Sequence, residues 1–201
     1  MGVSVRPHPN CMSPFELVFG LVTIVTSLAL THLLEGFVGL FRNAQRVRFS
    51  DVHALWSWSA FTSTVGNWAS FWALRSLESW PAWVVLLSVA TMILQYVFCA
   101  FVTPERPTEG TIDLVAFHQH EHRRYTGAAI ALFGLALVLN LALGGAHFYA
   151  DWWRDSAFSI AGLMLGFLAF FVQARWAQVV SASSLAVLLT YYVIITCNVV
   201  A

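Results

Sequence analysis

Two ionisable side chains, His32 and Glu35, stand three residues apart inside a long apolar stretch. On a helix such residues are neighbours, so an imidazole and a carboxyl group could share or pass a proton there. Glu35 lies about 10 Å along the helix axis from Arg42, and His32 lies about 15 Å from it. If this helix crosses a membrane, both are deep enough to suggest a proton or ion site. The alternative is a polar clamp between helices.

The same helix carries small and polar residues at steps of three or four, which places them on one face. They are Glu16, Gly20, Thr23, Ser27, Thr31 and Glu35, and together they form a stripe along the helix. Glu16 fits a capping box with Ser13. Ser27 and Thr31 extend the candidate site toward His32. The stripe could line a water-filled path or pack against another helix. We expect packing against a small-residue face of the next apolar segment, formed by Ser59, Ser63, Gly66 and Ser70.

Four apolar segments each carry a single amide side chain. They are Asn67, Gln95, Asn140 and Gln173. Each amide by itself is typical of a hydrogen bond between helices. If they converge on His32 and Glu35, they would form a polar site, and Asn67 is the amide we add to the candidate residues.

The tract from His118 to His122 contains the pattern H-x-x-E-H and resembles the inverzincin zinc-protease motif over five residues. The resemblance implies His118 and His122 as zinc ligands and Glu121 as the base. No third ligand follows in the sequence. The alternative is a juxtamembrane turn of His and Arg side chains, and we expect no cofactor other than this possible zinc.

Six uncharged and mostly apolar stretches of 18 to 26 residues separate the charges of the chain. A membrane-spanning helix needs about 20 residues. The sequence therefore predicts an all-α membrane protein, a bundle of six transmembrane helices. The expected spans are 14–41, 52–75, 81–102, 124–146, 156–174 and 178–199. They form a single domain, 14–201, after a short tail, 1–13. The loop at 103–123 is expected to become helical from Asp113.

The composition supports a membrane class. The chain has 201 residues, of which 59% are hydrophobic and 10% are charged, whereas soluble domains are about 25% charged. Its mean hydropathy is +0.72. The ten basic residues, all Arg, balance ten acidic ones, which argues against a nucleic-acid partner. Three widely spaced cysteines give no disulfide framework.

The distribution of arginine predicts the orientation. The first, third and fifth loops hold seven Arg residues, whereas the tail and the other loops hold three. The positive-inside rule places the seven in the cytoplasm. We therefore expect a multi-pass protein of the inner membrane with both termini outside the cytoplasm.

Three functions remain open. The leading hypothesis is a small channel or transporter, or a proton-responsive protein, for an unidentified ion or solute. The second is a non-catalytic membrane subunit or scaffold whose polar helix face serves assembly, including assembly into a homo-oligomer. The third is a metal-dependent membrane enzyme at His118 and His122.

Overall fold

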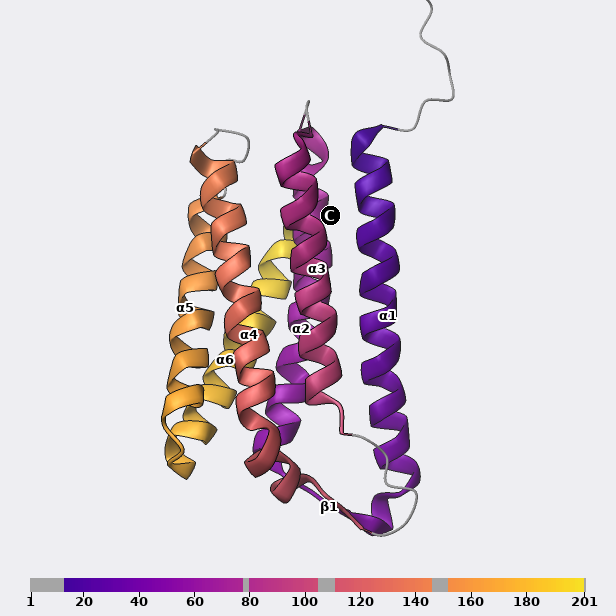
Figure 1. Ribbon diagram of the computed structural model, residues 1–201, viewed down its shortest axis with the longest axis vertical. Helices are drawn as coiled ribbons and strands as arrows, with labels where there is room; N and C mark the ends of the chain where they lie inside the picture. Colours follow the sequence, from indigo (N-terminus) through magenta and orange to yellow (C-terminus); the bar gives the residue numbers. More distant parts are fainter. Residues whose placement is uncertain (1–12, 78–79, 105–110, 146–151, 201) are drawn as a thin grey trace, which may run out of the picture.

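The computed structural model describes residues 13–77, 80–104, 111–145 and 152–200, which form six long helices and two very short strands (Figure 1). Of the expected tail, residues 1–12 lie outside this description. The helices are α1 (Pro14–Arg42), α2 (Asp51–Trp72), α3 (Ala82–Val102), α4 (Leu114–Gly145), α5 (Trp152–Phe171) and α6 (Arg175–Val200). Short 3-10 helices, η1 (Ala44–Arg46) and η2 (Ala73–Ser76), follow α1 and α2.

Successive helices alternate in direction and form an up-and-down bundle with α1 and α5 at its two sides (Figure 1). Side chains at the helix starts fix where two of them begin. Ser13 accepts a hydrogen bond from the Glu16 backbone, and the Glu16 carboxylate accepts one from the Ser13 backbone, so the predicted capping box is confirmed. Ser50 caps α2 by accepting from the His53 backbone.

A short parallel pairing of β1 (Val47–Arg48) with β2 (Ile112–Asp113) ties the segment before α2 to the start of α4. Asp113 accepts hydrogen bonds from the backbone N–H groups of Ala116 and Val115. It also forms an ion pair with Arg48. The bond from Ala116 and the other contacts hold the pKa of Asp113 below its usual value. The expected change to helix at this point is confirmed, because α4 runs without a break from Leu114.

The all-α prediction is confirmed, and five helices are long and apolar enough to cross a membrane: α1, α3, α4, α5 and α6. These helices are compatible with an integral membrane protein. The exact bundle of six spans is not confirmed, because α2 falls outside this set. Half of α2 is buried against α1, α3, α4 and α6, so protein rather than lipid covers its many hydroxyl side chains.

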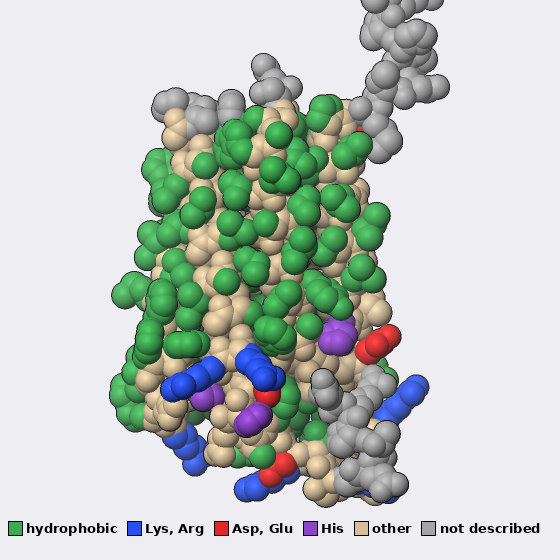
Figure 2. Space-filling model, viewed as in Figure 1, with side chains coloured by type: hydrophobic (Ala, Val, Ile, Leu, Met, Phe, Trp, Pro, Cys, Tyr) green, Lys and Arg blue, Asp and Glu red, His purple; other side chains and the backbone are tan. Residues whose placement is uncertain are grey.

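The face of the bundle in Figure 2 is apolar along most of its length, and most of the charged and histidine side chains visible there gather at one end. We call it the arginine-rich end. Its described arginines are Arg42, Arg46, Arg48, Arg123, Arg124 and Arg175. The opposite end holds Arg75 and Arg154 among the described residues.

The stripe of Glu16, Gly20, Thr23, Ser27, Thr31 and Glu35 lies on α1, and we call it the α1 stripe. Its expected pairing with the small-residue face of α2 is wrong. A Cβ built on Gly66 would lie 2.9 Å from Cδ1 of Tyr192, so this face of α2 packs against α6. Most of the α1 stripe instead faces outward, with Gly20, Ser27 and Thr31 exposed, whereas Thr23 accepts a hydrogen bond from Trp68 of α2. Helix α1 uses another face, that of Val18, Val22, Thr26, Ala29 and Leu33, to pack against the bundle. This face packs inward because it buries more apolar surface than the α1 stripe would.

Candidate functional site

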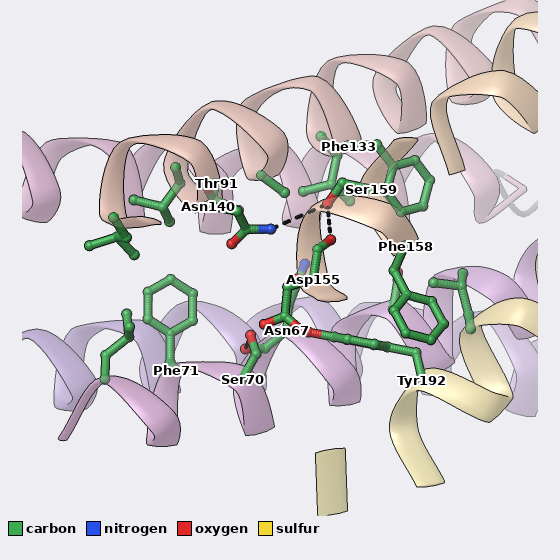
Figure 3. Close-up of a pocket in the computed structure, with 17 residues that line it drawn as sticks. Asn67, Ser70, Phe71, Thr91, Phe133, Asn140, Asp155, Phe158, Ser159 and Tyr192 are labelled. Atoms are coloured by element: carbon green, nitrogen blue, oxygen red, sulfur yellow. Dashed lines mark hydrogen bonds between the residues drawn. The ribbon is translucent and has the colours of Figure 1, made fainter. Parts of the chain in front are cut away.

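A small cavity with polar and apolar residues in its wall lies inside the bundle, in the half nearer the opposite end (Figure 3). We call it the Asp155 cavity. Its volume of about 60 Å³ suits a few water molecules or a small ion. The five helices α2 to α6 contribute to its wall. The polar lining residues are Ser63, Asn67, Ser70, Thr91, Asn140, Asp155, Ser159 and Tyr192.

Asp155 is the acidic residue of this cavity, and only 5% of its surface is exposed. It stands in the first turn of α5, where the helix dipole favours a negative charge. Its Oδ1 atom is 3.3 Å from Nε of Arg154. Ser159, one turn later, donates to the Asp155 backbone carbonyl and accepts a long hydrogen bond from Asn140. The cavity thus combines a buried carboxyl group with amide and hydroxyl groups.

Gln95 continues this polar region toward the middle of the bundle. Its Oε1 accepts from Nδ2 of Asn67 at 2.7 Å, and its Nε2 donates to Ser63 and Thr64 at 3.0 and 2.8 Å. Gln95 is 1% exposed, so no solvent replaces these bonds. Because Asn67 and Ser63 also line the Asp155 cavity, the cavity and the network are continuous.

Below this network, an apolar layer closes the interior. Trp56 is fully buried, and its ring centroid lies 6.3 Å from Phe98 and 5.3 Å from Tyr125. Leu132 and Leu185 belong to the same packed cluster. On the far side of the layer, the Tyr125 hydroxyl is hydrogen-bonded to Nδ1 of His118.

His118 in turn lines a second cavity, of about 590 Å³, near the arginine-rich end. We call it the Gln178 cavity. It lies between the first turns of α2 and α6 and the start of α4. Its polar lining residues are Arg48, Ser50, Asp51, His118, Gln119, His122, Gln173, Arg175 and Gln178. Two cavities with polar residues in their walls therefore lie toward opposite ends of the bundle, with a hydrogen-bonded network and an apolar layer between them.

The structure separates the residues that the sequence singled out. Asn67 and Asn140 line the Asp155 cavity and Gln95 is bonded to Asn67, whereas Gln173 lines the Gln178 cavity. His32 and Glu35 belong to neither cavity. The ring of His32 is half-buried, 6.2 Å from that of Tyr96 on α3. Three other candidates, Ser27, Thr31 and Glu35, are exposed on α1.

His118 and His122, the candidate metal ligands, have ring centroids 5.8 Å apart. One nitrogen of each ring already has a partner: Tyr125 for His118 and the Gln119 carbonyl for His122. Within the described ranges, no group of three or more His, Cys, Asp or Glu side chains comes together to hold a metal. Zinc binding here stays a prediction.

Sequence reasoning missed Asp155, Tyr192 and Gln178. The sequence reasoning used Asp155 only to mark where an apolar stretch begins. The spacing of Asp155 and Ser159, one helical turn apart, could have shown that both lie on the same helix face. Nothing in the sequence distinguished Tyr192 or Gln178 from other polar residues near apolar segments. A comparison with models of known protein families, a search of curated proteins and a search of solved structures each found no match.

Proposed function

We propose that this chain is a small membrane transporter or channel that carries protons or a small cation through the interior of the bundle. The observation that supports this most is the continuity of the Asp155 cavity with the buried Gln95 network. Asp155 is paired with Arg154 in the first turn of α5, but the amides of Gln95 and Asn67 lie deeper, where polar groups are costly and often functional.

The size and chemistry of the interior favour the proposed cargo. A cavity of about 60 Å³ excludes a large solute but holds a few waters. Asp155, which is paired with Arg154, supplies a carboxylate, and Asn67 and Asn140 supply amide groups beside it. The layer around Trp56 closes the route to the Gln178 cavity, as an apolar gate would.

The test is proton and potassium flux in proteoliposomes across pH 5 to 8, with wild type, Asp155→Asn and Glu35→Gln. Asp155→Asn removes the interior charge and should lower flux roughly tenfold or more. Glu35→Gln is the matched control, because it removes a carboxylate from the outer face of α1. If only Glu35→Gln abolished flux, the transport path would lie along α1, beside His32, and not through the Asp155 cavity. No wild-type flux above empty liposomes would contradict transport altogether.

A second function is favoured by the outward position of the α1 stripe: a membrane subunit that assembles with a second copy through this face. Nothing lies within 4 Å of a Cβ built on Gly20, so the face is open to a close approach. Ser27→Cys should form a disulfide-linked dimer in membranes when Cys11 and Cys197 are changed to serine. Val187→Cys, exposed on α6, is the control that should not cross-link. Equal yields from both positions, or none from Ser27→Cys, would contradict assembly through the stripe.

A further inference from the structure

One face of α4 leads from the Gln178 cavity to the Asp155 cavity. His118, Tyr125 and Leu132 follow one another at steps of seven residues, about two helical turns, which places them on the same face. His118 lines the Gln178 cavity, and Leu132 lines the Asp155 cavity. Tyr125 lines neither and lies about 10 Å along the helix axis from each of them. The side chain of Tyr125 is therefore part of the barrier between the two cavities.

The hydroxyl group of Tyr125 depends on a single partner. The residue is fully buried, and within the described part of the chain its hydroxyl makes one hydrogen bond, with Nδ1 of His118. If Nδ1 carried the hydrogen of this bond, the phenolic hydrogen would be left without an acceptor. The phenol is therefore the donor and His118 the acceptor. Because a buried hydroxyl is rarely left unpaired, this bond holds the Tyr125 ring in its place.

Trp56, which packs against Tyr125 in the apolar layer, has an indole N–H without an acceptor in the described ranges. Its side chain is fully buried, its Nε1 has no hydrogen-bond partner, and its ring centroid lies 5.3 Å from that of Tyr125. A buried donor without a partner destabilises the dry layer, and a water molecule that entered would accept from it. The layer is thus held closed by ring packing and by the bond from Tyr125 to His118.

We propose that the Tyr125–His118 hydrogen bond is the latch of the apolar layer, and that breaking it admits water between the two cavities. This inference rests on the proposed route through the interior. In the latched state the Tyr125 ring packs against Trp56 and excludes water. When the bond breaks, the ring is free to turn, and water reaches both the phenol and the indole N–H. Hydrophobic constrictions in channels open and close by such wetting and drying.

A native cysteine lies where the arrival of water can be measured. Cys99 is fully buried and belongs to the same packed cluster as Trp56 and Tyr125. Its Sγ atom is also 3.3 Å from Oγ1 of Thr64, in the hydrogen-bonded network beyond the layer. Only a thiolate reacts with a thiol reagent, so a thiol in this dry position is protected until water enters.

The test measures how fast methyl methanethiosulfonate modifies Cys99 in the purified full chain, with Cys11 and Cys197 changed to serine. Intact mass spectrometry follows the reaction. We expect slow modification in the chain with the native latch and a roughly fivefold higher rate in Tyr125→Phe, which lacks the one hydrogen bond. His118→Leu removes the acceptor and should raise the rate by about as much. The double variant should react no faster than either single variant, because both remove the same bond.

Two controls separate a latch from a general loosening of the bundle. His122→Leu removes the other histidine of the Gln178 cavity, which is bonded to the Gln119 carbonyl and not to Tyr125, and should leave the rate unchanged. Ser88→Cys, with Cys99 changed to serine, places the thiol at another fully buried position of α3, three turns away from the layer. This thiol should stay protected when Tyr125→Phe is added.

The outcomes separate the latch from transport. Unchanged modification of Cys99 in Tyr125→Phe and His118→Leu would overturn the latch, as would equal acceleration at Ser88→Cys or fast modification with the native latch. None of these results depends on flux. If the variants accelerate modification as expected and proteoliposomes carry no flux, the latch stands and the proposed transport fails. If flux is present and Cys99 stays protected in both variants, transport stands and the latch fails.

Discussion

Gln95 is the residue on which the polar interior depends most, because both polar atoms of its side chain are engaged. It joins α3 to three residues of α2, namely Ser63, Thr64 and Asn67. Hydrogen bonds between membrane helices contribute about 0.6 kcal/mol on average. Losing one partner costs more when the other is left buried without a replacement, about 1–3 kcal/mol. At Gln95 the cost of a buried group left without a partner should dominate, since the side chain is 1% exposed.

A double-mutant cycle at Gln95 and Asn67 tests this argument. Gln95→Leu should lower the free energy of unfolding by about 1–2 kcal/mol. Asn67→Leu should cost at least as much, about 1–3 kcal/mol, because it leaves Oε1 of the 1% exposed Gln95 side chain without its donor. The double variant should lose less free energy of unfolding than the sum of the two single losses, by about 0.5–1 kcal/mol, because both substitutions remove the same hydrogen bond. Unfolding in mixed detergent micelles measures all four proteins. Additive losses would mean that the 2.7 Å contact contributes nothing of its own.

At the scale of elements, helices pack through faces whose shapes are complementary. The surroundings of two glycines show which faces these are. Gly66 of α2 faces the ring of Tyr192, which is buried and lies 4.9 Å from the ring of Phe158. That ring has little room to move. Gly20 of α1 faces open space. The two glycines therefore give opposite expectations for the same substitution.

Gly66→Ala should destabilise the bundle by about 1 kcal/mol or more, because overpacking exceeds the gain in helix propensity. Gly20→Ala should be neutral or stabilising by up to about 1 kcal/mol, since it gains propensity and meets nothing within the chain. Thermal unfolding of the two variants in one detergent gives the comparison. Equal destabilisation by both would show that the outward face of α1 is packed in the folded protein.

The elements also show where prediction from sequence ended. Apolar length indicated the helices, and a local pattern indicated the Ser13–Glu16 capping box, because both depend on neighbours along the chain. Which polar residues meet depends on how each helix is rotated and which helix lies beside it. Asn67 and Gln95 come together for that reason, 28 positions apart in sequence. His32 and Glu35 were singled out because charge is rare in apolar segments, and rarity says nothing about which way α1 faces.

For the whole molecule, the asymmetry of charge between the two ends sets the expected orientation. Among the described residues, six arginines lie at the arginine-rich end, whereas Arg75 and Arg154 lie at the opposite end. Moving this charge across a membrane is costly, so the positive-inside rule favours the arginine-rich end in the cytoplasm. The Gln178 cavity would then open toward the cytoplasmic leaflet, and the Asp155 cavity would lie in the outer half.

Reporter fusions after Ala201 test this orientation, because α6 runs away from the arginine-rich end (Figure 1). Alkaline phosphatase, which needs the oxidising periplasm, should be active there, and green fluorescent protein should be dark. A fusion truncated after Arg175 places the reporter at the arginine-rich end and should give the reverse pattern. A fluorescent fusion at Ala201 would show that the orientation is the opposite one, with the Gln178 cavity at the outer leaflet.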